Sequence, residues 1–332
     1  MNADSGSGSA ERPAYYKPCR PHNCRRANFH DYKAHFSYLI TVSKSTEAPS
    51  FSSIIGGLLD PADPPRCKLT TAGSIIQCQI EALPVDFPLL CIPAYVIMLD
   101  HIHLLVQVRS RLDRDLGYYI GLFKTRCTKN YHEAKIGSGA LFMPKFNDRI
   151  AFSRPHFQRF VDYVADNPRR RLMAMSHPEL FESQRGVMIG DREFSFYGNF
   201  LLLREPDIVP VVVSSRYTSE ERARWELRWE QTMRNQGVLI SPFISAAEKA
   251  IMREGIEAGC SLIRIIPDGM APRAKAQGLE FELCSERRLL LIGESRQSKR
   301  NEALSRDRAL GCNSLAFWIA ENTGSVMKLL RK

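Results

Sequence analysis

Long apolar segments are missing from this 332-residue sequence. It contains no uninterrupted apolar run of about 18 residues, the length that a membrane-spanning helix requires. A secretory signal is missing too: residues 1–12 are polar and rich in Gly and Ser, and we expect residues 1–24 to form a disordered tail. The nine cysteines do not follow the paired spacings of a disulfide framework. These absences predict a reduced, cytoplasmic protein with no membrane partner.

Familiar cofactor motifs are also missing. The sequence has neither the GxGxxG of dinucleotide-binding domains nor the Walker motif of P-loop enzymes. Cys19, His22 and Cys24 lie close together, but no fourth zinc ligand follows at a usable spacing. The chemistry of this chain must therefore be sought in other residues.

Acidic residues are too few to balance the basic ones. The formal charge is +10 and the sequence pI is about 9.2. Residues 1–175 carry 23 Lys and Arg against 15 Asp and Glu, whereas the remainder carries 23 against 21. Basic proteins bind phosphate backbones by releasing counterions. The charge therefore predicts a nucleic-acid partner for the N-terminal half, and the length predicts two domains.

Two histidines stand in the most hydrophobic segment of that half. We expect a strand over residues 94–108, in which side chains alternate between faces, so that His101 and His103 share one face and Ile102 points to the core. Two imidazoles fixed on one face of a strand can hold one divalent metal ion. The plain structural alternative is a pair of polar residues on a half-exposed strand face.

A tyrosine and an asparagine recur together downstream. Apolar residues at positions 157, 160, 161 and 164 predict an amphipathic helix, which Pro168 should end at or just before Asn167. Tyr163 and Asn167 then share one face near the helix end. Tyr163 is either a nucleophile or an ordinary aromatic; Tyr118, Tyr119 and Tyr131 lie closer to the histidines in sequence. Asn167 is either a ligand or a helix C-cap.

These two segments resemble signatures of a known family, the HUH-type single-tyrosine transposases, in the branch of REP-associated tyrosine transposases. Residues 98–104 read Met-Leu-Asp-His-Ile-His-Leu and resemble the family's Met-Pro-Asn-His-x-His signature, followed by a hydrophobic residue. Residues 163–168 read Tyr-Val-Ala-Asp-Asn-Pro and resemble its Tyr-Ile-x-x-Asn-Pro box. The resemblance covers roughly residues 25–175. Leu99-Asp100 replaces the usual Pro-Asn, which places an extra carboxylate beside the first histidine.

The resemblance implies a fold and a chemistry. Residues 25–178 would form an α+β domain with a ferredoxin-like antiparallel sheet and helices on one face, commonly dimeric. His101, His103 and Asn167 would hold Mg²⁺ or Mn²⁺, and Tyr163 would form a 5′-phosphotyrosine bond with single-stranded DNA that contains a hairpin. The expected function is therefore a transposase, a metal-dependent enzyme that nicks and rejoins single strands.

Two basic groups could contact this DNA. A helix over residues 112–133 presents Lys124, Arg126 and Lys129, although a solvated amphipathic helix fits the same pattern. Arg169, Arg170 and Arg171 follow the tyrosine helix, where they could touch phosphates or only complement the helix dipole. We expect both groups to bind DNA.

The second half of the sequence has a different hydrophobic pattern. Buried strands are predicted over residues 200–203, 208–213, 238–242, 262–266 and 288–292, with helices over residues 219–235 and 246–258. This alternation predicts a Rossmann-like α/β domain over residues 185–325, with a mostly parallel sheet. Residues 239–243 and 265–269 resemble the nucleotide-binding superfamily that includes the DNA-processing protein A family. Ser241 and Ser245 would form an anion or nucleotide site at a helix N-terminus, unless they only cap the helix.

Two other functions remain open at this stage. The chain could be a domesticated DNA-binding protein that retains the fold without transposition. It could also be a nucleotide sensor that acts through residues 185–325 and uses the N-terminal half only for docking.

Overall fold

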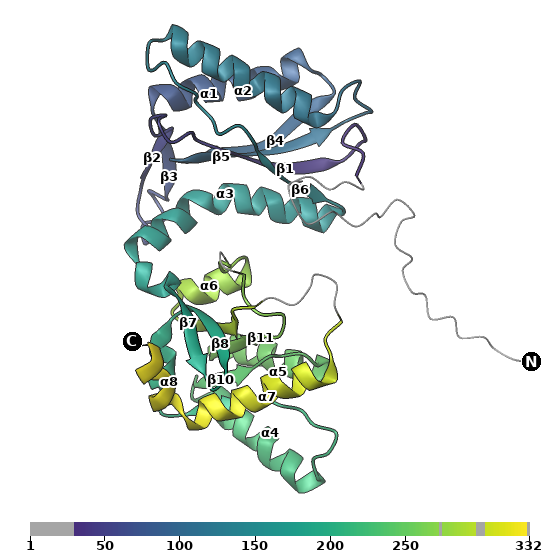
Figure 1. Cartoon of the computed structure of the whole chain (residues 1–332), viewed down its shortest axis with the longest axis vertical. Helices are drawn as coiled ribbons and strands as arrows, with labels where there is room; N and C mark the ends of the chain where they lie inside the picture. Colours follow the sequence, from purple (N-terminus) through teal and green to yellow (C-terminus); the bar gives the residue numbers. More distant parts are fainter. Residues whose placement is uncertain (1–29, 272–273, 297–302, 331–332) are drawn as a thin grey trace, which may run out of the picture. The chain divides into compact units, whose positions relative to one another are not determined.

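The computed structural model describes residues 30–271, 274–296 and 303–330 (Figure 1). The chain divides into two compact units, residues 1–172 and 173–332. The predicted tail over residues 1–24 and the group Cys19, His22 and Cys24 lie outside the described residues. Each unit has its own sheets and its own core, so each is described by itself.

The first unit contains a four-stranded antiparallel sheet and three helices. Its elements are β1 (Ser37–Ser43), β2 (Ser52–Ile55), β3 (Arg66–Leu69), α1 (Thr71–Asp86), β4 (Leu90–Ile97), β5 (His101–Val108), α2 (Leu116–Glu133), β6 (Asn147–Ala151) and α3 (Arg154–Ser176). The strand order is β4-β5-β1-β6, and β2 and β3 form a separate two-stranded ribbon. An α+β fold with an antiparallel sheet is therefore what the sequence predicted for this half.

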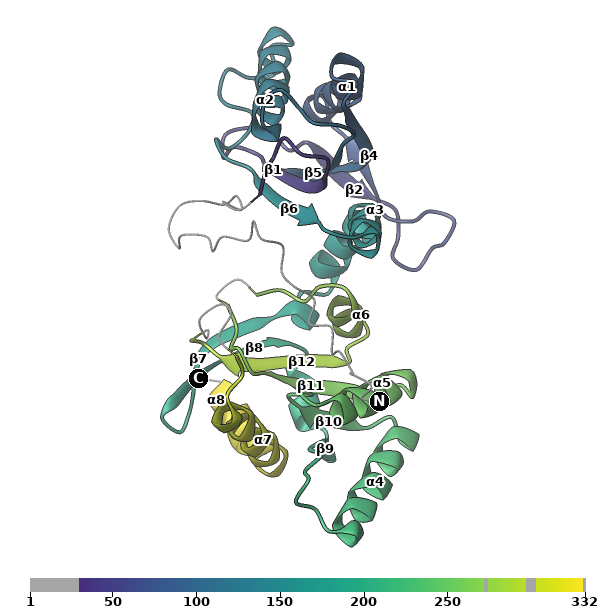
Figure 2. The ribbon, with the colours of Figure 1, turned by 90° about the vertical axis from the view of Figure 1, so that its right-hand side faces the viewer.

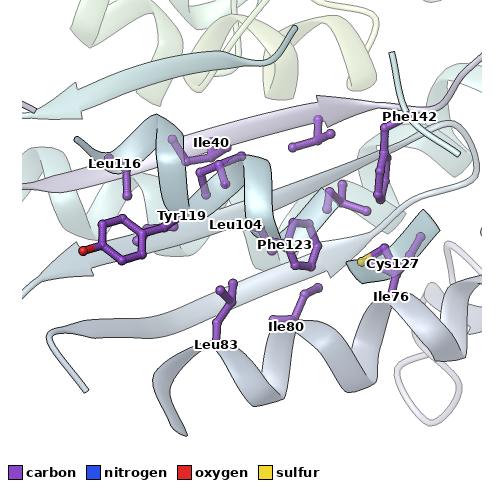
Figure 3. Packing of buried hydrophobic residues seen from close by; sticks show 14 of the residues in the cluster. Ile40, Ile76, Ile80, Leu83, Leu104, Leu116, Tyr119, Phe123, Cys127 and Phe142 are labelled. Carbon is purple, nitrogen blue, oxygen red and sulfur yellow. The ribbon is translucent and has the colours of Figure 1, made fainter. Parts of the chain in front are cut away.

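The main core of this unit lies between the sheet and the pair α1 and α2. Ile76, Ile80 and Leu83 of α1 meet Leu116 and Phe123 of α2 over one face of the sheet (Figure 3). Thr70 caps the start of α1 by accepting a hydrogen bond from the backbone N–H of Gly73. The predicted helix over residues 112–133 is thus confirmed from Leu116 onward, and the apolar stripes of α1 and α2 explain their positions on the sheet.

Helix α3 covers the opposite face of the same sheet. Phe160 and Val164 of α3 pack against Leu39 of β1 and Leu105 of β5 in a second, smaller core. Figure 1 and Figure 2 show α1 and α2 on one side of this sheet and α3 on the other. The expectation of helices on one face is therefore wrong: Leu39 and Leu105 give the opposite face an apolar patch, and α3 covers it.

Two local predictions in this unit are also wrong. Residues 94–108 are not one strand, because the chain turns at Leu99 and Asp100 between β4 and β5, where the N–H of Met98 donates to the carbonyl of His101. Pro168 does not end α3, which runs on to Ser176. A helix tolerates one buried proline at the cost of one backbone hydrogen bond, and burial of its apolar face offsets that loss.

The second unit contains a six-stranded mixed sheet. Its elements are the 3-10 helix η1 (Pro178–Phe181), β7 (Ser183–Ile189), β8 (Arg192–Gly198), the 3-10 helix η2 (Phe200–Arg204), β9 (Ile208–Pro210), α4 (Ser219–Arg234), β10 (Val238–Ser241), α5 (Ala246–Glu257), β11 (Ser261–Ile266), α6 (Leu279–Ser285), β12 (Leu289–Glu294), α7 (Arg306–Glu321) and α8 (Thr323–Leu330). The order is β7-β8-β12-β11-β10-β9. Strands β9 to β12 pair in parallel, and β8 pairs antiparallel with β12 and β7.

Helices cover both faces of this sheet. Leu315 of α7 and Val326 of α8 belong to one core, and Trp229 of α4 and Phe281 of α6 belong to the other. The predicted strand over residues 200–203 is wrong. Gly198 has a positive φ of 116° that turns the chain out of β8, and the side chain of Asn199 then caps η2.

None of the described helices is both long enough and apolar enough to cross a membrane.

Candidate functional site

The two histidines lie where β5 begins and share the face of the sheet that α3 covers. Ile102, between them, is fully buried in the core on the other face. His103 is 5% exposed, whereas His101 is about one-quarter exposed at its side chain. Their Nε2 atoms are 3.1 Å apart. Strand alternation therefore brings the two imidazoles together as the sequence predicted.

Each imidazole has a hydrogen-bond partner at its Nδ1 atom. Thr41 Oγ1 lies 2.9 Å from Nδ1 of His103, because Thr41 and His103 are partners in the pairing of β1 with β5. Asp100 Oδ1 lies 2.6 Å from Nδ1 of His101. A partner at Nδ1 orients the ring, and where that partner accepts the Nδ1 proton the Nε2 lone pair is available to a metal ion. The two Nε2 atoms face each other.

Burial sets the charge of His103. It lowers the pKa of His103 to about 3, helped by the nearby charges of His101 and Arg149. The hydrogen bond with His101 lowers the pKa of Asp100 to about 2, and the charge of Arg171 acts in the same direction. His103 is therefore neutral and Asp100 ionised at neutral pH, which are the protonation states that suit a ligand and its supporting carboxylate.

Tyr163 reaches this pair from α3. Its hydroxyl lies 3.5 Å from Nε2 of His103, and the two rings meet edge to face with centroids 5.2 Å apart. Phe160, about one turn before Tyr163, and Val164, the residue after it, anchor this part of α3 on the sheet. The helix stripe that predicted burial at these positions therefore also places the tyrosine hydroxyl over the histidines.

Asn167 lies one turn after Tyr163 and is 7% exposed. Its Nδ2 donates to the backbone carbonyl of Tyr163 at 2.6 Å. It is not a helix C-cap, because α3 continues for nine residues beyond it. The amide is therefore held inside the helix, with its remaining oxygen as the atom that could serve a ligand role.

The histidine pair suits a divalent metal ion. Two nitrogen ligands at right angles on an ion about 2.1 Å away would be about 3.0 Å apart, close to the observed Nε2–Nε2 distance of 3.1 Å. Within the described residues no group of three or more His, Cys, Asp and Glu side chains could hold a metal. A site at His101 and His103 therefore needs an amide, a hydroxyl, water or the substrate to complete it.

The three arginines after Tyr163 have different surroundings. Arg169 forms a two-pronged ion pair with Asp166, with N–O distances of 2.5 and 2.9 Å. Arg170 lies over the Tyr163 ring, 5.7 Å from its centroid, and its guanidinium is 3.8 Å from Asp166. Arg171 is exposed and acts on the charge of Asp100. Arg170 and Arg171 thus border the site, whereas Arg169 is neutralised within the helix.

The basic residues of α2 do not border the site. Because α2 covers the other face of the sheet, Lys124, Arg126 and Lys129 lie away from His103. Lys124 donates to the carbonyls of Met143 and Pro144, Arg126 pairs with Asp86, and Lys129 pairs with Glu133. Lys124 and Lys129 line a surface cavity of about 530 Å³. This cavity therefore lies away from the histidines.

The other tyrosines of this region lie on that face too. Tyr131 is 4% exposed and packs into the α1–α2 core, and Tyr119 is buried near Asp113. Tyr118 is half exposed on α2. Among these four tyrosines it is Tyr163 that meets the histidine pair, although the other three lie closer to it in sequence.

In the second unit, the predicted anion site is filled by the chain itself. Ser245 caps α5, and its Oγ accepts a hydrogen bond from the N–H of Glu248. The buried carboxylate of Glu248 accepts from the N–H groups of Ile244, Ser245 and Val213. Ser241 is fully buried and accepts from the N–H of Phe243. A carboxylate therefore occupies the position of the expected anion, which argues against Ser241 and Ser245 as a ligand site.

Sequence reasoning included Arg170 among the candidate DNA-binding residues but missed Thr41 as a neighbour of the site. Thr41 reaches His103 through strand pairing across 62 residues, which no local pattern reveals. Arg170 follows Tyr163 by seven residues, two helical turns, and this spacing agrees with its place over the Tyr163 ring.

No protein-family model and no curated protein matches this chain. Among solved structures, it is similar to a REP-associated tyrosine transposase bound to a REP hairpin, with 18% sequence identity and a TM-score of 0.32. The similarity covers 43% of this chain and 72% of that one. It is a weak resemblance at the level of the fold and has no weight in assigning a function.

Proposed function

We propose that this protein is a metal-dependent enzyme that nicks and rejoins single-stranded DNA through a covalent bond to Tyr163. The observation that carries the proposal is the meeting of Tyr163 with the histidine pair: its hydroxyl is 3.5 Å from Nε2 of His103, which is itself 3.1 Å from Nε2 of His101. The resemblance of residues 98–104 and 163–168 to HUH-type signatures supports the same chemistry.

Tyr163 is the nucleophile in this proposal. Its oxygen attacks the scissile phosphorus and loses its proton to solvent, while the bond from phosphorus to the 3′-oxygen breaks and that oxygen takes up a proton. The products are a 5′-phosphotyrosine and a free 3′-hydroxyl. Attack by another 3′-hydroxyl reverses these steps, so rejoining needs no ATP. A phenol has a reference pKa of about 10 and is a weak nucleophile unless its surroundings stabilise the phenolate.

Mg²⁺ or Mn²⁺ would be held by His101, His103 and Asn167. When bound, such an ion offsets the charge that develops on the phosphate oxygens. Thr41 and Asp100 would orient the histidine ligands, and the bond from Asn167 to the Tyr163 carbonyl would keep ligand and nucleophile in register on α3. Arg170 and Arg171 would meet the phosphates that flank the scissile bond.

The partner in this proposal is single-stranded DNA that contains a hairpin, and the basic excess of residues 1–175 supports a nucleic-acid partner. We further propose residues 25–178 as the nuclease domain and residues 185–325 as a Rossmann-like accessory domain. The parallel strands β9 to β12, covered by helices on both faces, support the second assignment. A homodimer remains a prediction from the motif resemblance.

The nucleotide-sensor function has less support. It depended on an anion site at Ser241 and Ser245, where the carboxylate of Glu248 now takes the backbone donors. A domesticated DNA-binding protein would retain the fold but form no covalent product, so the following assay separates it from the proposed enzyme.

The test is nicking of a hairpin-rich pool of labelled single-stranded DNA in the presence of Mn²⁺. Wild type should produce shortened strands, and Tyr163→Phe or added EDTA should abolish them. Tyr118→Phe is the matched control, because Tyr118 lies on α2, on the other face of the sheet, and should nick like wild type. DNA binding without nicking by wild type would favour the domesticated protein. Equal nicking by Tyr163→Phe would refute the proposed nucleophile.

A further inference from the structure

A second feature of the first unit lies where β6 ends and α3 begins. A surface cavity of about 430 Å³ opens there between the ends of β1, β5 and β6 and the first turn of α3. Neither the histidine pair nor Tyr163 lines this cavity, so the proposed chemistry does not account for it.

Three phenylalanine rings line this cavity. Phe152, in the link between β6 and α3, is 58% exposed, and Phe36 and Phe157 are partly buried beside it. Phe36 holds the Phe152 ring edge to face, with centroids 6.3 Å apart. His30 also packs edge to face on both rings, at 4.6 Å from Phe36 and 6.4 Å from Phe152. An aromatic ring that is fixed at its edges and exposed to solvent is a surface on which another flat ring can stack.

Cationic and hydrogen-bonding groups complete the lining. Arg154, the first residue of α3, is exposed at the rim, and His35 is exposed at the rim formed by the segment before β1. Gln107 on β5 adds an amide on the floor. Aromatic faces with a neighbouring cation and an amide are the combination that binds unpaired bases, the rings by stacking and the cation at the phosphate.

The cavity lies on the same face of the sheet as the histidine pair. Gln107 follows His103 by four strand residues, or about 13 Å, and Arg154 precedes Tyr163 by nine helix residues, or about 13 Å. Measured along β5 or along α3, the cavity therefore lies at the opposite end of the contact between these two elements from Tyr163. A short stretch of unpaired strand bound at Tyr163 could therefore extend into it.

We propose that this cavity, referred to below as the Phe152 pocket, holds an unpaired nucleobase of the DNA strand whose phosphate reaches Tyr163. The base stacks on Phe152 and Phe157, Gln107 meets its polar edge, and Arg154 meets an adjoining phosphate. The inference rests on the proposed function for the identity of its ligand, but it assigns a separate binding site with residues of its own.

The test compares binding of two labelled probes at equal length, a short oligothymidylate and the same backbone with abasic residues. Stacking of one base on an aromatic side chain is worth about 1–3 kcal/mol, so Phe152→Ala should weaken oligothymidylate binding by roughly fivefold to a hundredfold. It should leave abasic binding nearly unchanged. Tyr118→Ala is the matched control, because Tyr118 is also half exposed but lies on α2, and both affinities should match wild type.

A second variant separates the base from the phosphate. Arg154→Gln should weaken both probes alike and reduce the slope of log affinity against log salt by about 0.7, the contribution of one phosphate contact in a single strand. Equal affinity of wild type and Phe152→Ala for oligothymidylate would overturn the pocket. So would an equal loss for both probes in Phe152→Ala, since that loss would not involve a base.

These outcomes are independent of the covalent chemistry. If wild type forms the Tyr163 adduct and Phe152→Ala binds oligothymidylate normally, the enzyme stands and the pocket fails. If binding depends on Phe152 but wild type forms no adduct, the pocket stands and the proposed nucleophile fails.

Discussion

At the scale of single residues, the candidate site consists of the two imidazoles and of the side chains that orient them. Thr41 holds His103 with a neutral hydroxyl, and Asp100 holds His101 with a carboxylate. A carboxylate behind a ligand raises the basicity of the imidazole more than a hydroxyl does. Asp100 is also where this sequence departs from the signature it resembles. In the proposed site, the departure would therefore strengthen His101 as a metal ligand.

Removing the hydroxyl of Thr41 should weaken metal binding. In Thr41→Val, Nδ1 of His103 loses its partner and the ring is free to turn, so we expect the affinity for Mn²⁺ to fall by about tenfold or more. Calorimetric titration of the full chain with Mn²⁺ measures this. Thr125→Val on α2 is the matched control, because its hydroxyl also bonds inside the chain but far from the histidines, and its affinity should stay unchanged. Equal affinities of Thr41→Val and wild type would refute a supporting role for Thr41.

At the scale of elements, one glycine allows the start of α1 to pack closely against the backbone of Phe51. A Cβ at Gly73 would lie 2.0 Å from the backbone carbonyl oxygen of Phe51, a contact that no side-chain rotation relieves. A Cβ at Gly121, inside α2, would meet nothing within 4 Å. The same substitution therefore has opposite consequences in two neighbouring helices.

Gly73→Ala should destabilise the first unit by about 2 kcal/mol or more, because backbone must move to accept the methyl group. Gly121→Ala should stabilise it by up to about 1 kcal/mol, because alanine favours the helix and loses less entropy on folding. Hydrogen exchange of the amides of β1 and β5 reports the stability of this unit for each variant. Loss of protection in Gly121→Ala, or none in Gly73→Ala, would contradict the packing described for α1.

Local sequence patterns predicted those elements in which the hydrophobic periodicity of the sequence agrees with the burial seen in the structure. The stripes of α2 and α3 and the apolar runs of β10, β11 and β12 all lie where the sequence placed them. The patterns failed where a nonlocal or compensating effect decides. Pro168 lies inside α3 because the packed face of the helix outweighs one missing hydrogen bond, and residues 200–203 coil into η2 because Gly198 turns the chain.

The same distinction between local and nonlocal effects applies to the candidate site. The parity of His101 and His103 and the helical spacing of Tyr163 and Asn167 were readable from the sequence, and the structure brings the first three side chains together. Thr41 was not readable, because its contact depends on the register of β1 with β5. The position of Lys124, Arg126 and Lys129 relative to the histidines was not readable either, because the sequence does not state which face of the sheet a helix covers.

At the scale of the whole molecule, the chain consists of two units with separate cores, and the three tryptophans, Trp225, Trp229 and Trp318, all lie in the second. Tryptophan fluorescence therefore follows the unfolding of residues 173–332, whereas titration with Mn²⁺ tests the proposed histidine site of the first unit. The two signals can be measured on the full chain.

Glu248→Gln should change the unfolding followed by tryptophan fluorescence and leave the Mn²⁺ titration unchanged. The buried carboxylate accepts three backbone N–H groups, and an amide that points its own donors at them leaves at least one unsatisfied. We expect the fluorescence-detected unfolding free energy to fall by about 1–3 kcal/mol. The affinity for Mn²⁺ should match wild type. A loss of Mn²⁺ affinity in Glu248→Gln would show that the second unit supports the site, contrary to the separate cores.

The central claim is that Tyr163 becomes covalently bonded to DNA, and the most direct measurement identifies the modified residue. After reaction with single-stranded DNA and Mn²⁺, the adduct is digested with nuclease and protease and its peptides are sequenced by mass spectrometry. We predict a nucleotide bonded through its 5′-phosphate to Tyr163 in the peptide that contains residues 160–168. A nucleotide on any other residue, or a stable adduct formed by Tyr163→Phe, would contradict the account.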